Sequence, residues 1–234
     1  MVFIFLIVVI IPNQGNRNSN DAIALAQTME GALDETTSML QKIRTLAVQA
    51  SNGTNTAEDR KALQQEVTSL SKEITRIADQ TKFGGQQVLA GKGKGFIGAN
   101  GSISFQVGAN KGDEIALTGF SSSFALSGIA SMANINPVGA LADAKNTGIV
   151  KTAANETRWS VSSAEAAKKT LENIDKFIAA VDSKRADLGA FQNYTHANHS
   201  NIKQYNLMYL FWLFFGHYVV SIIFVVSMVD KKNI

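Results

Sequence analysis

Apolar and polar positions follow a helical period over the first long amphipathic stretch of the chain, from Asp21 to about Ala50. Apolar or small residues recur there every three or four positions, which places one apolar stripe on a helix of about eight turns. Asn20 or Ser19 is predicted to cap the start of this helix, and Ser51-Asn52-Gly53 to end it. The stripe comprises Ala26, Met29, Leu33, Thr36, Leu40, Ile43, Ala47 and Ala50, whereas Asp34, Glu35, Lys42 and Arg44 fall mostly off it.

A second helix is predicted to start near Thr56, because Thr56 followed by Asp59 is a loose variant of the capping box. A short Gly/Asn turn joins it to the first helix, so the two are expected to form an antiparallel pair. The predicted stripe of this second helix is Leu63, Val67, Leu70, Ile74 and Ile77.

Around Phe83-Gly84-Gly85 the pattern changes from helical to extended. Residues 102–108 alternate polar and apolar side chains, and Glu114-Ile115-Ala116-Leu117 follow the turn signal at 110–113, which predicts a β-hairpin. Residues 118–157 are rich in Ser, Ala, Gly and Asn, and they are predicted to be a small variable region.

A third helix is predicted from about Ser162 to Asn193, with Ser162 or Ser163 as its cap. It is expected to pack beside the first two helices, none of which has enough apolar surface to be stable alone. The fold class is therefore mainly α: an elongated antiparallel helical bundle with a β-hairpin region and a small variable insertion. The predicted stripe of the third helix is Leu171, Ile174, Ile178, Val181 and Leu188.

The two ends of the chain have a different composition. Residues 2–11 are apolar throughout but too short to span a bilayer, so they are either a leader foreign to the rest of the protein or an export signal. Pro12 and the polar residues after it are expected to break this pattern. Residues 207–229 contain no charged side chain and are a candidate transmembrane segment, with His217 inside it and Lys231 and Lys232 beyond it.

Composition and charge narrow the function classes only a little. The chain has 234 residues, 45% of them hydrophobic, and a formal net charge of +3. Lys92 and Lys94 in a glycine-rich stretch are the nearest feature to a basic patch and are interpreted as a solvated turn, so no nucleic-acid partner is predicted. Because the chain has no cysteine, disulfides, thiolate metal sites and cysteine nucleophiles are excluded.

No arrangement of residues indicates an enzyme. His196 and His199 share a helical face but have no third ligand, so no metal site is predicted. The glycine runs lack the surroundings of phosphate-binding or dinucleotide-binding motifs, and no cofactor is implied. The remaining carboxylates are interpreted as solvated helix faces: Asp34, Glu35, Glu66, Glu73 and Asp79.

Three segments resemble the bacterial flagellins, in the order that the family has them. Residues 16–89, from NRNSND to FGGQQVL, closely resemble the amino-terminal rod-domain region. ISFQVGANKGDEIAL at 103–117 looks like the family's β-hairpin, and AAKKTLENIDKFIAAVDSKRADLGAFQN at 166–193 is similar to its carboxy-terminal helix. The resemblance covers about Asn13 to Asn193, with 118–157 weakly matched.

This resemblance implies a structural subunit of the flagellar filament that serves motility, is secreted, and needs no catalytic residue. Its implied partners are other flagellin subunits, the flagellar export chaperone and secretion apparatus, and the innate immune flagellin receptor. The positions that match the family's receptor surface are Lys42, where the family often has Arg, Leu46 and Glu66. Leu46 is equally well interpreted as a core residue.

The resemblance also implies a domain division: a non-family leader at 1–12, rod-domain helices and hairpin at 13–117, the variable region at 118–157, the carboxy-terminal rod-domain helix at 158–193, and a non-family apolar tail at 194–234. Flagellins carry polymerisation helices where this chain has its apolar ends, so impaired assembly and an origin by truncation or frame change are expected. Two alternatives are a membrane-anchored helical stalk or sensor, held by 207–229, and an inactive subunit that blocks export or assembly.

Overall fold

A computed structural model describes the backbone of residues 2–108, 110–137, 139, 144–152 and 154–230. Within these it describes the side chains of residues from 14 to 198 except 144 and 145, together with those of 200 and 211. The fold is mostly helical with three small two-stranded sheets, β1–β2, β3–β4 and β5–β6. The helices are α1 (Val2–Ser51), α2 (Ala57–Gln80), α3 (Leu126–Met132), α4 (Ala144–Thr147) and α5 (Ala164–Asp230). The strands are β1 (Lys82–Phe83), β2 (Gln86–Gln87), β3 (Ile103–Gln106), β4 (Glu114–Leu117), β5 (Ile149–Lys151) and β6 (Thr157–Trp159).

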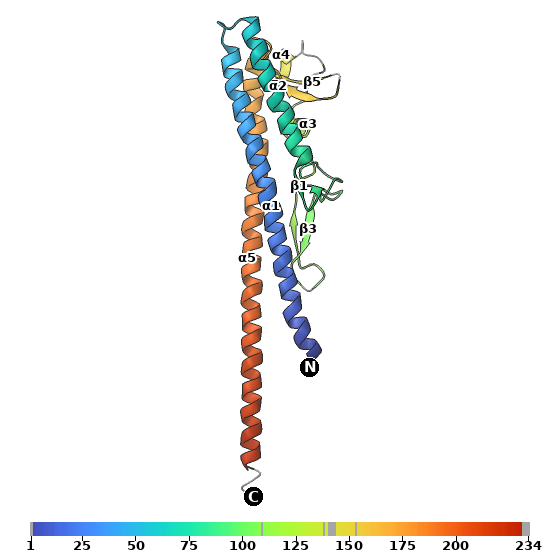
Figure 1. Cartoon of the computed structure of the whole chain (residues 1–234), viewed down its shortest axis with the longest axis vertical. Coiled ribbons are helices and arrows are strands. Elements are labelled where there is room, and N and C mark those ends of the chain that lie inside the picture. Colours follow the sequence, from blue (N-terminus) through green and yellow to red (C-terminus); the bar gives the residue numbers. More distant parts are fainter. Residues whose placement is uncertain (1, 109, 138, 140–143, 153, 231–234) are drawn as a thin grey trace. The chain divides into compact units, whose positions relative to one another are not determined.

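Two compact units share these elements. The larger unit comprises Ala24–Ser104 and Ala116–Gln192, and the smaller comprises Met1–Ile23, Phe105–Ile115 and Asn193–Ile234. In the larger unit, α2 returns alongside α1, and the first part of α5 lies beside both (Figure 1). The predicted class, a mainly α fold with an antiparallel helical bundle and a β-hairpin region, is confirmed, and the structure adds further two-stranded antiparallel sheets.

The predicted stripe of the first helix forms the core of the larger unit. All eight residues of the stripe are buried. Asp34, Glu35, Lys42 and Arg44 are exposed, as the pattern predicts. A spacing of three and four residues places successive side chains of the stripe on the same side of a helix. This part of the fold therefore follows from local periodicity.

The start of α2 follows its predicted capping box. Thr56 Oγ1 accepts a hydrogen bond from the Asp59 backbone N–H, and the Asp59 carboxylate accepts one from the Thr56 N–H at 2.9 Å. The buried stripe of α2 differs from the prediction. Its buried members are Val67, Ser71, Ile74 and Ala78, whereas Leu63, Leu70 and Ile77 are half-buried.

The third predicted helix is α5, and its cap is confirmed. Ser163 Oγ accepts a hydrogen bond from the Ala166 N–H at 3.1 Å. In the predicted stripe, Ile174, Val181 and Leu188 are buried, and Leu171 and Ile178 are half-buried. Phe177, which the pattern did not select, is fully buried. Its ring packs edge-on against that of Trp159, with the two ring centroids 4.6 Å apart. The predicted end at Asn193 is wrong, because α5 continues to Asp230.

The predicted start of the first helix is also wrong, because α1 runs without interruption from Val2 through Pro12 to Ser51. The polar residues expected to break it bond along the helix instead. Gln14 Nε2 donates to Asn18 Oδ1 at 3.0 Å, and the buried Ser19 donates through Oγ to the Gly15 carbonyl at 2.9 Å. A serine that bonds the carbonyl four residues earlier lies inside a helix rather than at its cap.

The predicted hairpin corresponds to β3 and β4, and its turn is held by the Asp113 carboxylate, which accepts from the Asn110 N–H at 2.9 Å. The region at 118–157 contains α3, α4 and β5, which the sequence pattern did not predict. Within the residues whose side chains are described, no helix is long and apolar enough to cross a membrane. The candidate segment at 207–229 lies outside these residues, apart from Phe211.

Candidate functional site

The three residues predicted to form a receptor surface lie on α1 and α2 of the larger unit. Lys42 Nζ and Glu66 Oε1 form an ion pair at 2.8 Å, and their side chains are 58% and 43% exposed. Leu46 lies one helical turn beyond Lys42 but is only 8% exposed. The structure therefore brings Lys42 and Glu66 together on the surface and places Leu46 in the packing layer.

A row of polar contacts joins α1 to α5. Gln192 donates to Glu30 at 2.8 Å, Arg185 pairs with Asp34 at 2.8 Å, Thr37 donates to Asp182 at 3.3 Å, and Arg44 pairs with Asp175 at 2.9 Å. As the residue number rises along α1 from 30 to 44, that of its partner falls along α5 from 192 to 175, so the two helices are antiparallel in this unit. These contacts join side chains that are more than 130 residues apart in the chain, and they flank the buried stripe of α1.

A second set of polar contacts ties α2 to β6, and sequence analysis missed it. Ser71 Oγ accepts from the Trp159 N–H at 3.2 Å, and both residues are fully buried. The Gln64 side chain donates to the Trp159 carbonyl at 3.0 Å and accepts from the Val161 N–H at 2.6 Å. These contacts satisfy main-chain groups that the short strand β6 leaves unpaired, which explains why a serine occupies the buried stripe of α2.

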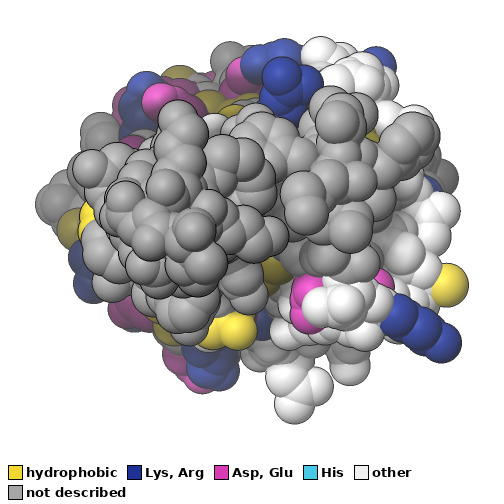
Figure 2. Space-filling view, turned by 90° about the horizontal axis from the view of Figure 1, so that it is seen from below, with side chains coloured by type: hydrophobic (Ala, Val, Ile, Leu, Met, Phe, Trp, Pro, Cys, Tyr) yellow, Lys and Arg dark blue, Asp and Glu magenta, His cyan; other side chains and the backbone are white. Residues whose placement is uncertain are grey.

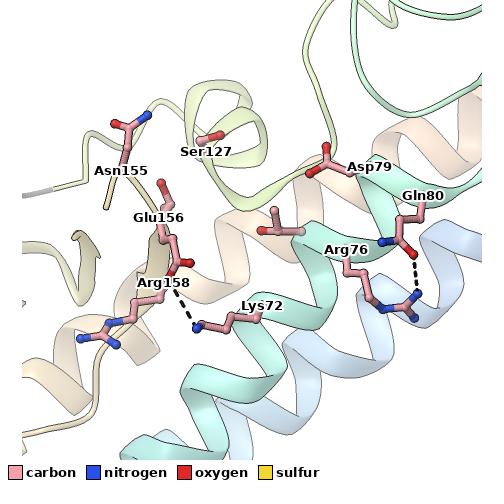
Figure 3. A pocket seen from close by; sticks show the side chains of 10 residues that line it. Lys72, Arg76, Asp79, Gln80, Ser127, Asn155, Glu156 and Arg158 are labelled. Carbon is pink, nitrogen blue, oxygen red and sulfur yellow. Dashed lines mark hydrogen bonds and ion pairs between the residues drawn. The ribbon is translucent and has the colours of Figure 1, made fainter. Parts of the chain in front are cut away.

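A polar pocket of about 400 Å³ lies between α2, the start of α3 and the residues at β6. Figure 3 shows Lys72 reaching from α2 toward Glu156, a pair at 3.6 Å, and Arg76 reaching along α2 toward Gln80. Arg76 is also bound by Glu73, with its Nε 2.7 Å from Glu73 Oε2. The basic groups of Lys72 and Arg76 are therefore engaged with neighbouring side chains.

Three carboxyl groups on the helices have lowered pKa values, all through surface contacts. Hydrogen bonds from Arg76 lower the pKa of Glu73, and a hydrogen bond from Lys169 lowers that of Glu172. Hydrogen bonds from the Thr56 side chain and backbone lower the pKa of Asp59 at the start of α2. Each shift favours the charged form, which suits ion pairs and helix caps rather than proton transfer near neutral pH.

Among the described residues, no three potential metal ligands lie together. Of the three histidines in the sequence, His196 is exposed. The side chains of His199 and His217 are not among those that the structure describes. On the face shown in Figure 2, Lys and Arg side chains stand at separate places near the edge, several of them beside Asp or Glu.

Comparison with known proteins identifies the amino-terminal part of the chain. Residues 12–94 match the family described as the bacterial flagellin N-terminal helical region. The chain is 47% identical over 102 residues to Flagellin B of Vibrio cholerae, a match that covers 44% of this chain and 25% of that protein. It is 48% identical over 106 residues to the B-type flagellin of Pseudomonas aeruginosa, covering 45% of this chain and 20% of the relative.

Solved structures with a similar fold cover more of the chain. The crystal structure of Bacillus cereus flagellin matches with a TM-score of 0.59 and 25% sequence identity, over 80% of this chain and 88% of that one. A flagellar hook-associated protein from Vibrio parahaemolyticus shares the fold, with a TM-score of 0.62 at 15% identity. The matched segments span about a quarter of the length of the curated relatives. Through the helical region at residues 12–94, this protein is a relative of the bacterial flagellins.

Proposed function

We propose that this chain is a structural subunit of a bacterial flagellar filament, with no catalytic activity. The observation that carries the proposal is the antiparallel pairing of α1 with α5 over a fully buried stripe, bounded by the Arg185–Asp34 and Arg44–Asp175 pairs. A rod of this kind is stiffened by contacts between distant parts of the chain, which a filament subunit under mechanical load requires. The match to flagellins supports the same role.

The outer faces of the rod suit repeated contacts between copies. Charged side chains off the stripe, such as Glu35 on α1 and Lys61 on α2, are exposed. A contact between two different faces of identical subunits can repeat from copy to copy, and it generates a helical filament when its rotation does not close into a ring. The proposed partners are other flagellin subunits, together with the export chaperone and secretion apparatus that would deliver the chain to the filament outside the cell.

The test is elongation of filament seeds. Purified chain is added to short seeds of a flagellin such as Flagellin B of Vibrio cholerae, and filament length is measured by electron microscopy. The proposal predicts that the chain adds to the seeds and lengthens them. If this chain neither lengthens the seeds nor sediments with them while the intact flagellin does, the chain is not a filament subunit.

We also propose that the face formed by Lys42 and Glu66 contacts the innate immune flagellin receptor. Both side chains are exposed and lie 2.8 Å apart, so they present neighbouring groups of opposite charge on the surface. Leu46 is 8% exposed, so its side chain belongs to the packing layer of α1 and offers little surface to a receptor. Lys42 keeps the positive charge of the family's usual arginine but lacks its two-pronged hydrogen bonding, so weaker binding is expected than with arginine.

A receptor reporter assay tests this surface. Glu66→Ala is expected to weaken the response, and Lys42→Arg to strengthen it. Glu58→Ala is the matched control, because Glu58 lies on the same helix and its side chain is 85% exposed. Equal responses from the Glu66→Ala and Glu58→Ala variants, with circular dichroism unchanged in both, would remove Glu66 from the receptor surface.

A further inference from the structure

Two Asn-Gly sequences occur in this protein, Asn52-Gly53 and Asn100-Gly101. An asparagine followed by glycine is chemically labile, because the glycine N–H can reach the asparagine side-chain amide when the backbone is free to rotate. Both asparagines are exposed to solvent. Their surroundings differ, and the difference bears on which one reacts.

Gly53 lies in the open turn between α1 and α2. It is exposed, and a Cβ atom built on it would meet no heavy atom within 4 Å. Within the described part of the chain, no acceptor binds the Gly53 N–H, although neighbouring N–H groups are bonded. The Asn52 side chain accepts from the Thr54 N–H at 3.2 Å, so it lies folded over the turn that contains Gly53. The reacting nitrogen is therefore free and its backbone has room to rotate.

Gly101 is held in place. It is buried, with φ at +76°, and its N–H donates to the Gly98 carbonyl at 2.9 Å. A Cβ atom on Gly101 would lie 2.2 Å from Ser121 Oγ, so the backbone is packed against a neighbouring segment. For Asn100 to react, the hydrogen bond must break and this packing must loosen.

We propose that Asn52 is a site of spontaneous deamidation in the folded protein, and that Asn100 is protected by its fold. The Gly53 nitrogen attacks the carbonyl carbon of the Asn52 side chain, and the new bond closes a succinimide ring. The bond between that carbon and the Asn52 amide nitrogen breaks, and ammonia leaves with the proton that Gly53 gave up. Water then adds to one of the two ring carbonyls and gives aspartate or isoaspartate, with no oxidation or reduction. This inference is independent of the proposed filament function.

The product changes the turn between α1 and α2. The Asn52 carbonyl accepts from an Arg60 guanidinium nitrogen at 3.0 Å and from the Asn55 N–H at 3.3 Å. Isoaspartate adds a carbon to the main chain at this point and displaces that carbonyl from its two donors. Either product also places a negative charge just beyond the C-terminal end of α1, where the helix dipole disfavours it. The tip of the α1–α2 pair therefore accumulates charge and disorder with age.

Peptide mapping by mass spectrometry tests the proposal on the full chain, aged in mildly alkaline buffer. The Asn52 peptide is expected to deamidate about two- to tenfold faster than the Asn100 peptide. This factor is the slowing expected at Asn100 if the Gly101 hydrogen bond must break before the reaction. In denaturant the two rates are expected to converge, because the protection of Asn100 comes from the fold.

The variant Gly53→Ala provides the matched control. Gly53 has open space around it and its φ lies outside the left-handed region, so alanine is compatible with the fold. The substitution is expected to slow deamidation at Asn52 and to leave Asn100 unchanged. Equal rates at the two sites in the folded chain, or an Asn52 rate that Gly53→Ala does not lower, would overturn the proposal.

Discussion

Replacing Leu40 with alanine removes one buried side chain from the centre of the α1 stripe. Leu40 is 0% exposed and among the largest fully buried side chains. The change deletes three carbon atoms, which at about 0.8 kcal/mol each gives roughly 2.4 kcal/mol of lost transfer free energy. A residual cavity raises the cost, so the free energy of unfolding should fall by about 2.7–5 kcal/mol. This loss is a large share of the total stability of a domain, which is only about 5–15 kcal/mol.

Urea denaturation followed by far-ultraviolet circular dichroism measures this loss, and in thermal melts it corresponds to a fall of roughly 5–20 °C. Val48→Ala is the matched control on the same helix, because Val48 is 52% exposed and its truncation should change stability by no more than about 0.5 kcal/mol. If Leu40→Ala costs no more than Val48→Ala, the stripe does not form the core and the packing described for α1 is wrong.

Three further changes test the local structure. Thr56→Ala removes the cap of α2 and should cost about 0.5–2 kcal/mol in urea denaturation, whereas an unchanged midpoint would show that the capping box contributes nothing. The pKa of Glu73 is lowered in the fold by Arg76, so its contribution to stability is present above its unfolded pKa and is lost as pH falls through the folded value. Glu73→Gln should therefore reduce the fall of the melting temperature on acidification, and an acid limb that keeps the wild-type slope would refute this. Gly95→Ala places a Cβ 1.9 Å from the Gln87 carbonyl oxygen at φ +57°, and a melting temperature equal to that of the wild type would contradict the expected loss of at least about 1–2 kcal/mol.

The features of the fold that sequence analysis predicted correctly are those encoded over a few neighbouring residues. The α1 stripe is an example, because its spacing alone selects residues that are all buried. The Thr56–Asp59 capping box is another, since both hydrogen bonds form within three residues. The cap at Ser163 follows the same rule.

The features that were missed depend on partners far away in the chain. Ser71 is buried because it bonds the main chain of Trp159, 88 residues later, and no local pattern marks a serine for that role. Phe177 falls off the predicted stripe but packs on the same Trp159. The ion pair between Lys42 on α1 and Glu66 on α2 likewise needed the packing of the two helices. These distant contacts could have been predicted only from an alignment of relatives in which the two residues of each pair vary together.

The antiparallel pairing of α1 with α5 is the central structural claim, and cross-linking measures it most directly. The natural chain has no cysteine, so Thr37→Cys with Asp182→Cys introduces a single pair at a contact of 3.3 Å. A short thiol cross-linker is expected to join this pair within one molecule at high yield. It should not join Val48→Cys to Asp182→Cys, since residue 48 lies about 16 Å farther along the helix. Equal yields for the two pairs, or failure of the first, would contradict the pairing on which the proposed filament function depends.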